Sequence, residues 1–153
     1  MEIIRDHSGH LFWNQLWNTG NSLEKGQSMT LKTVSVRYIV NDVDEAIGFY
    51  TKMLDFRIDM HPAVEFAIVS KGNLRLLLSK PSGRGGGGMT MPDGTFQVPG
   101  GWNRFQIEVH DLEPVVHKLR DAGCVFRNEI VNGVGGRQIL LQDLSGNLIE
   151  LFQ

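Results

Sequence analysis

The sequence predicts an α+β protein in which two tandem βαβββ modules form a curved mixed sheet with a concave ligand cup, with helices on the outer face. An internal duplication is the first observation behind this prediction. VRYIVNDVDEAIGFYTKMLDF aligns with FQIEVHDLEPVVHKLRDAGCVF at a constant offset, so that Asp42 pairs with Asp111. GNLRLLL and GNLIELF give a further match at a longer offset. The second observation is that strand alternation changes to helical spacing and back within each copy.

The first copy begins with VSVRYIV at residues 34–40, whose alternating polarity predicts a strand. Asp42 is then the expected helix N-cap, and Glu45, three residues later, completes a capping box. Apolar residues continue at helical spacing through Val43, Ala46, Ile47, Tyr50, Met53 and Leu54. FRIDM, VEFAIVS and NLRLLLS follow, and the turn residues between them predict three short strands.

The second copy repeats this order. Strand alternation in FQIEV places Phe105, Ile107 and Val109 on one face, and Asp111 is the expected N-cap of the next helix. Gly123 follows that helix, where a C′ glycine is favoured. CVFRNEIV, RQILLQD and NLIELFQ are the expected strands, and the GVGG turn accounts for the extra length of this copy.

These boundaries divide the chain into a first module at residues 32–80, a linker at residues 81–101 and a second module at residues 102–153. The linker contains three prolines and the run GRGGGG. A connection of this length in a compact domain is a linker or a lid, and we expect a linker. GRGGGG does not predict a phosphate loop, because it lacks the Gly-Lys-Ser/Thr ending.

Residues 1–31 form an N-terminal extension outside the duplication. Lys25 and Gly26 can be encoded by purine-rich codons of the kind found in a ribosome-binding site, just upstream of Met29. We therefore hypothesise that Met29 is the native start and that the extension lies upstream of it.

The composition excludes several function classes. The chain has 153 residues, 41% of them hydrophobic and 21% charged, as in an ordinary globular domain. A net charge of -2 without a basic run gives no reason to expect nucleic acid or a membrane surface as partner. Cys124 is the only cysteine, so no internal disulfide can form, and no signal peptide or apolar membrane segment is evident. We expect a cytoplasmic protein.

ND-V-DEAI-FY at residues 41–50 and QD-SGN-IELFQ at residues 142–153, together with the duplicated modules, resemble the vicinal oxygen chelate superfamily. This superfamily includes glyoxalase I, bleomycin-resistance proteins and extradiol dioxygenases. The resemblance covers about residues 32–153 and implies a homodimer. One departure is Asp55, where the family commonly has glycine after its first helix.

The resemblance also implies four metal-ligand positions, one in the first and one in the last strand of each module. They fall on Ser35, Leu76, Arg104 and Glu150. Only Glu150 is a good ligand, because guanidinium and leucine offer no lone pair, and no His or Cys compensates. We therefore expect no cofactor; if a divalent metal binds, Glu150 is its ligand.

The concave face is expected to carry charged residues that balance each other. Arg104 and Glu150 should lie on neighbouring strands and form an ion pair, and Arg37 and Glu108 form a possible second pair. Two interpretations of Arg104 stay open. It replaces the metal as the partner of Glu150, or it offers its donors to a carboxylate, phenolate or carbonyl of a ligand.

Two functions follow from this reasoning. The first is a glyoxalase-like or bleomycin-resistance-like protein that binds a small organic molecule in a cup whose metal site is largely lost. The alternative is a lyase, isomerase or dioxygenase of the same superfamily with Glu150 as catalytic base or metal ligand, so whether the chain is an enzyme stays open. Trp102 stacks on the ligand or packs under the linker. The expected ligand-binding residues are Ser35, Arg37, Leu76, Trp102, Arg104, Gln106 and Glu108.

Overall fold

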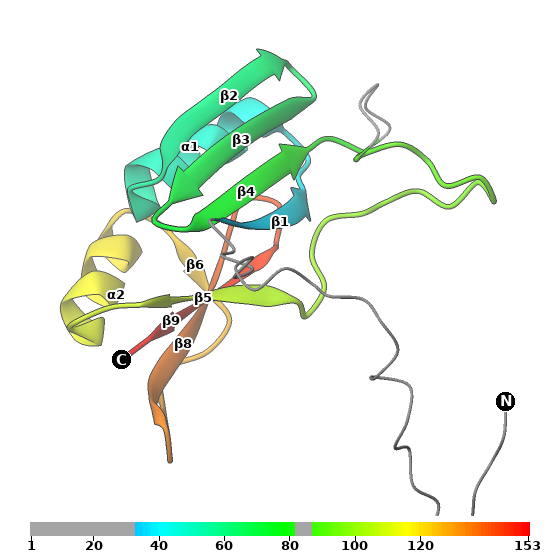
Figure 1. Ribbon diagram of the computed structural model, residues 1–153. Helices are drawn as coiled ribbons and strands as arrows, with labels where there is room; N and C mark the ends of the chain where they lie inside the picture. Colours follow the sequence, from blue (N-terminus) through cyan, green and yellow to red (C-terminus); the bar gives the residue numbers. More distant parts are fainter. Residues whose placement is uncertain (1–32, 82–86) are drawn as a thin grey trace, which may run out of the picture. The chain divides into compact units, whose positions relative to one another are not determined.

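A computed structural model describes residues 33–81 and 87–153 (Figure 1), so the predicted N-terminal extension lies outside the described residues. The first module contains β1 (Val34–Ile39), α1 (Val43–Leu54), β2 (Arg57–Ala63), β3 (Phe66–Lys71) and β4 (Leu74–Ser79). The second contains β5 (Arg104–Glu108), α2 (Leu112–Asp121), β6 (Val125–Phe126), β7 (Val131–Gly133), β8 (Gly136–Gln142) and β9 (Leu148–Phe152). No helix of the described residues is long and apolar enough to span a bilayer.

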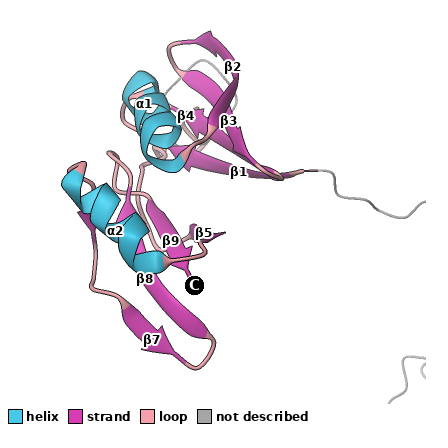
Figure 2. Ribbon diagram, turned by 90° about the vertical axis from the view of Figure 1, so that its left-hand side faces the viewer, coloured by secondary structure: helices cyan, strands magenta, loops and turns pink. Residues whose placement is uncertain are grey.

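The strands form two mixed sheets, one in each module. The first has the order β1-β4-β3-β2 and the second has the order β5-β9-β8-β6, with β7 also paired to β8. In each sheet the first strand pairs in parallel with the last strand of its module, while the other pairs are antiparallel. Each helix lies against one face of its own sheet (Figure 2). The predicted α+β class with two βαβββ modules is confirmed.

The first helix begins and ends where its sequence predicts. Asp42 is extended, with φ of -139°, and its carboxylate accepts the Glu45 N–H at 2.9 Å. Asp55 ends the helix in the left-handed region, with φ of 56°, and the Phe56 N–H donates to the Tyr50 carbonyl at 3.1 Å. The position at which the resemblance predicts glycine therefore has the backbone conformation that favours glycine.

The start of the second helix differs in one respect from the prediction. Asp111 occupies the N-cap position, but its side chain makes no capping hydrogen bond. Instead, the side-chain oxygen of Gln153 accepts the Leu112 N–H at 3.0 Å. The C-terminal residue therefore supplies the acceptor that the helix end requires. Gly123 has φ of 81° after the helix, as its predicted C′ role requires.

The run CVFRNEIV is divided into two short strands, β6 and β7. The division occurs at Asn128, whose side-chain oxygen accepts the Leu140 N–H at 2.9 Å. A side chain thereby takes the place of a backbone acceptor next to the β6 pairing. Alternation of polar and apolar residues does not reveal that a side chain replaces a backbone acceptor here. This explains why a single strand was predicted.

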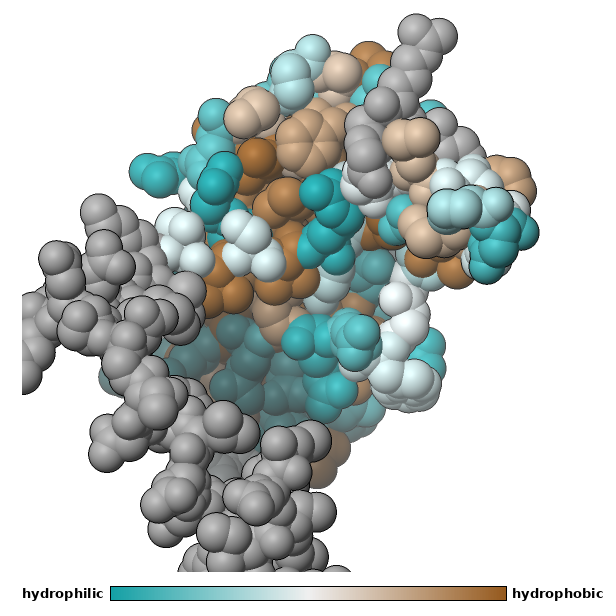
Figure 3. All heavy atoms as spheres, turned by 45° about the vertical axis from the view of Figure 1, so that its right-hand side comes forward, coloured by the Kyte–Doolittle hydropathy of each residue, from teal (hydrophilic) through white to brown (hydrophobic). Residues whose placement is uncertain are grey.

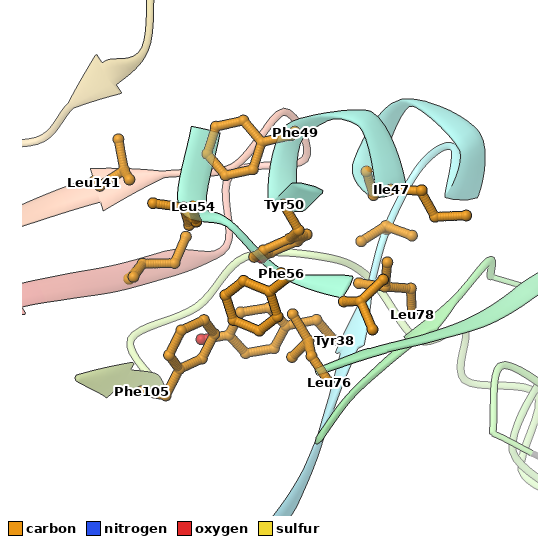
Figure 4. Close-up of a cluster of buried hydrophobic side chains, with 14 of the residues drawn as sticks. Tyr38, Ile47, Phe49, Tyr50, Leu54, Phe56, Leu76, Leu78, Phe105 and Leu141 are labelled. Atoms are coloured by element: carbon orange, nitrogen blue, oxygen red, sulfur yellow. The ribbon is translucent and has the colours of Figure 1, made fainter. Parts of the chain in front are cut away.

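One hydrophobic core connects the two modules. Tyr38 of β1 and Phe105 of β5 have ring centroids 5.5 Å apart, and Phe56 lies 6.2 Å from Phe105 (Figure 4). The cluster also contains Tyr50, which packs edge to face against Phe56 at 5.4 Å. Burial of aromatic rings from both copies stabilises the modules against each other.

A buried polar network also joins the modules. Asp143, at the end of β8, accepts hydrogen bonds from the Tyr50 hydroxyl at 2.9 Å and from the Asn147 side-chain amide at 2.8 Å. Its other oxygen accepts the backbone N–H groups of Ser145 and Asn147. The Tyr38 hydroxyl donates to the Leu148 carbonyl at 2.6 Å. Every one of these contacts satisfies a polar group that burial would otherwise leave unpaired.

Asn147 extends this network to the linker. Its side-chain nitrogen donates to the Ile39 carbonyl of the first module at 2.9 Å, and its side-chain oxygen accepts the Gly100 N–H at 2.8 Å. The described linker residues 87–101 contain no helix or strand. A turn at residues 91–95 and the Gly100 contact give this segment its backbone hydrogen bonds.

Candidate functional site

The register of the second sheet decides which side chains lie away from its helix. Gln106 pairs with Glu150, whereas Phe105 pairs with Ile149 on the core face. Because neighbouring residues of a strand point to opposite faces, Arg104, Gln106 and Glu108 share the open face with Glu150. The shared face of Arg104, Gln106 and Glu108 agrees with the prediction from strand alternation.

Arg104, Gln106 and Glu150 form a hydrogen-bonded cluster on this face. Arg104 Nε donates to Glu150 Oε2 at 2.6 Å, and Gln106 Nε2 donates to Glu150 Oε1 at 2.7 Å. Glu150 is only 7% exposed, so the two donors compensate a carboxylate that has lost most of its water. The predicted ion pair between Arg104 and Glu150 is present.

These contacts keep Glu150 ionised. Burial alone would raise the pKa of Glu150. The hydrogen bonds from Gln106 and Arg104 and the Arg104 charge outweigh this effect, so the pKa lies below its usual value. A carboxylate with a lowered pKa is a weak proton acceptor at neutral pH.

An open hollow of about 370 Å³ lies over the cluster, lined by Trp102, Asn103, Arg104, Gln106 and Glu150. Trp102 is 68% exposed, so it does not pack under the described part of the linker. The Arg127 guanidinium lies 5.2 Å from the centroid of the Trp102 ring. A cation on an indole face favours a fixed ring orientation. Sequence reasoning missed Arg127, because only the pairing of β6 with β8 brings it to this place.

Leu76 does not reach an open face. It is fully buried in the core together with Leu78, and its neighbour in β1 is Val36. The residue of β4 that pairs with Arg37, as Glu150 pairs with Gln106, is Leu77. The alignment of GNLRLLL with GNLIELF was therefore one residue out of register for the strands, and a shift of one residue reverses the face.

Ser35 and Arg37 lie on the open face of the first sheet, but Arg37 does not pair with Glu108 as suggested. Arg37 Nη1 donates to the Ser79 hydroxyl, and its guanidinium lies 5.8 Å from the Phe66 ring centroid. Glu108 is exposed, and no ion pair joins it to Arg37 in the described residues. Ser79 and Phe66 gave no signal in the sequence, because the pairing of β4 with β1 and with β3 places them beside Arg37.

The four family positions do not suit a divalent metal. With the corrected register they hold Ser35, Leu77, Arg104 and Glu150, so one carboxylate stands among a hydroxyl, an alkyl group and a cation. Both oxygens of that carboxylate already accept hydrogen bonds. A divalent metal needs several oxygen, nitrogen or sulfur donors. Residues 33–81 and 87–153 contain no group of three or more His, Cys, Asp or Glu side chains that could supply them elsewhere.

A second hollow, of about 840 Å³, was not predicted from the sequence. It lies beside α1, where Phe49 and Lys52 face residues 122–125, 142–144 and Gly146 of the second module. Cys124 contributes to its lining, and burial raises the pKa of this thiol. The described histidines His61, His110 and His117 are exposed.

Comparison with known proteins agrees with this architecture. No curated protein matches the chain by sequence. A member of the glyoxalase/bleomycin resistance protein/dioxygenase superfamily from Sphaerobacter thermophilus has a similar structure, with a TM-score of 0.65 and 23% identity over 82% of this chain and 98% of that one. Lactoylglutathione lyase from Agrobacterium tumefaciens has a TM-score of 0.62 and 17% identity, over 78% of this chain and 90% of that one.

An antibiotic binding protein from Streptomyces sp. CB03234 has a TM-score of 0.60 and 24% identity, over 79% of this chain and 93% of that one. At these identities the structures show a shared fold. The family model of the Glyoxalase/Bleomycin resistance protein/Dioxygenase superfamily matches residues 32–151. The chain therefore belongs to the glyoxalase/bleomycin resistance protein/dioxygenase superfamily.

Proposed function

We propose that the protein binds a small organic molecule in the hollow over Arg104, without a divalent metal. The observation that carries this proposal is the fixed cluster of Arg104, Gln106 and Glu150 beneath an exposed Trp102. Glu150 occupies Arg104 Nε and leaves Arg104 Nη2 and the Gln106 amide oxygen without partners among the described residues. These groups offer donors and an acceptor to the polar edge of a ligand, while the indole offers a stacking face.

Binding is favoured over catalysis by the state of Glu150. As a base it would have to accept a proton, but its lowered pKa and its two donors oppose this. The same two donors fix the carboxylate and orient the Arg104 fork, which suits recognition. The antibiotic binding protein with the same fold supports this class of function, whereas the lyase supports the alternative.

Native mass spectrometry of the full chain purified without chelator tests the proposal directly. We expect a co-purifying organic molecule that is lost from the Trp102→Ala and Arg104→Gln variants. Arg120→Gln is the matched control, because Arg120 pairs with exposed Glu129 and lines no part of this hollow. Retention of the molecule by both site variants would contradict the proposal. Stoichiometric zinc, nickel, manganese or iron in the same sample would contradict binding without a metal.

A Glu150→Gln variant separates binding from catalysis. The amide keeps the shape of the side chain but removes its charge and its ability to act as a base. We expect weaker ligand binding, because Arg104 loses its charged partner. If the variant instead keeps its affinity and stops converting the molecule to a product, Glu150 is a catalytic base and the enzyme alternative holds.

We further propose a homodimer, as the family resemblance implies. In the described residues the first sheet has β1 and β2 as its edge strands, and the second has β5 and β6. An edge strand exposes unpaired backbone groups to a second copy. Light scattering after size-exclusion chromatography would give twice the chain mass of 17.2 kDa for the dimer, and the monomer mass would refute it.

A further inference from the structure

We propose that the open face of the first sheet binds a planar organic anion, such as an aromatic carboxylate, and that Arg37 is its charge partner. This adds a charge-selective surface to the proposed small-molecule binding and is carried by different residues. It does not require the hollow over Arg104.

Arg37 and Arg127 are the two described arginines without a carboxylate partner, and only Arg37 lies on the open face of the first sheet. Arg104 is neutralised by Glu150, and Arg120 and Arg137 pair with Glu129 and Glu113. On the first sheet, Arg57 and Arg75 both approach Asp59, at 3.2 and 4.0 Å. Within residues 33–81 and 87–153, Arg37 has no carboxylate partner. A cation in this position attracts an anion from solution.

The Arg37 guanidinium is also held in place. It donates to the hydroxyl of Ser79, which is buried, and it lies over the Phe66 ring. The backbone at Gly87 passes so close that a Cβ atom there would overlap the guanidinium. A side chain at position 87 would therefore displace the guanidinium. A fixed guanidinium loses little rotamer freedom when it binds, so its remaining N–H groups are suited to a planar carboxylate.

Apolar side chains lie beside Arg37 on the face of the sheet. Leu77 is its neighbour in β4, and Ile68 is the neighbour of Leu77 in β3 on the same face. Figure 3 shows hydrophobic side chains gathered at the upper part of the molecular face, at the level of the first sheet, with hydrophilic ones beside them. An anion bound to a cation beside apolar side chains is less well screened by water, which strengthens the attraction. These side chains also favour an aromatic body over a hydrated inorganic ion.

Calorimetric titration of the full chain with 2-naphthoate and with its neutral analogue 2-naphthamide tests the inference. We expect 2-naphthoate to bind at least tenfold more tightly than 2-naphthamide. Arg37→Gln should abolish that difference, since the charged hydrogen bonds are lost. Arg75→Gln is the matched control, because it removes the same charge from the same face, and it should change the affinity less than twofold.

Three results would overturn the inference. They are equal affinities of the two probes for the unmodified chain, an equal loss of affinity in the Arg37→Gln and Arg75→Gln variants, and no binding of either probe at millimolar concentration. Arg104→Gln separates the two proposals. If it abolishes 2-naphthoate binding while Arg37→Gln does not, the anion occupies the hollow over Arg104, and only the proposed function survives.

Discussion

Replacing Asp143 by asparagine is expected to destabilise the fold strongly, although the two side chains have the same shape. The Asp143 oxygens accept four hydrogen bonds, from the Tyr50 hydroxyl, the Ser145 N–H and two N–H groups of Asn147. The side chain is buried, at 5% exposed. An asparagine amide has one oxygen and one NH2 group, so the NH2 group must face donors.

The size of the effect follows from this mismatch. The amide oxygen can keep the two hydrogen bonds on one side, and the two on the other side are lost. A hydrogen bond to a charged group contributes about 1.5 kcal/mol or more to stability, so the loss amounts to about 3 kcal/mol. No cavity forms, because the volume of the side chain hardly changes, and the loss therefore reports the network alone.

Urea denaturation followed by circular dichroism measures this difference in the free energy of unfolding. Asp121→Asn is the control, because Asp121 is exposed at the end of α2 and should change stability by less than about 0.5 kcal/mol. A Tyr50→Phe variant removes one of the four donors and should lose less than Asp143→Asn. A loss below about 1 kcal/mol for Asp143→Asn would refute the four-donor account.

Three further predictions concern other residues. Burial raises the pKa of Tyr38 to about 12 and raises that of Tyr50 well above its usual value, so ultraviolet titration should show little phenolate below pH 11, and stability should fall as the pH rises from about 10 to 12. Leu76→Ala should lower the free energy of unfolding, measured by urea denaturation, by about 2 to 5 kcal/mol, and Leu77→Ala should lower it by less than half as much. Equal losses would contradict the register of β4 against β1. The lowered pKa of Glu150 contributes stability above about pH 4.5, and this contribution is lost as the pH falls through the pKa of Glu150 in the folded protein. Glu150→Gln should therefore make the free energy of unfolding depend less on acid pH.

Most of the elements were predicted well from the sequence, because local chemistry determines them. Asp42 caps a helix through a contact only three residues away, and alternation in Phe105 and Ile107 assigns their face without knowledge of their neighbours. The ion pair of Arg104 with Glu150 was also predictable, because the repeat places both strands at matching positions in the module.

The errors arose where a partner distant in sequence decides the outcome. Leu76 was placed one residue out of register because two similar GNL segments were aligned by their letters, and strand pairing sets the face. Arg37 was matched to a distant acid, although a buried hydroxyl and an aromatic ring from its own sheet hold it. Neither outcome can be inferred from spacing along a single chain.

The contact of Asn147 with Gly100 has a consequence for how this protein can diversify. The amide oxygen accepts a main-chain N–H, so the bond does not depend on which side chains precede Gly100. Insertions or substitutions between Met89 and Pro99 should therefore leave the start of β5 and the Arg104 hollow in position. Evolution, or an engineer grafting new loops, can alter what borders this protein's binding surfaces without disturbing the residues beneath them.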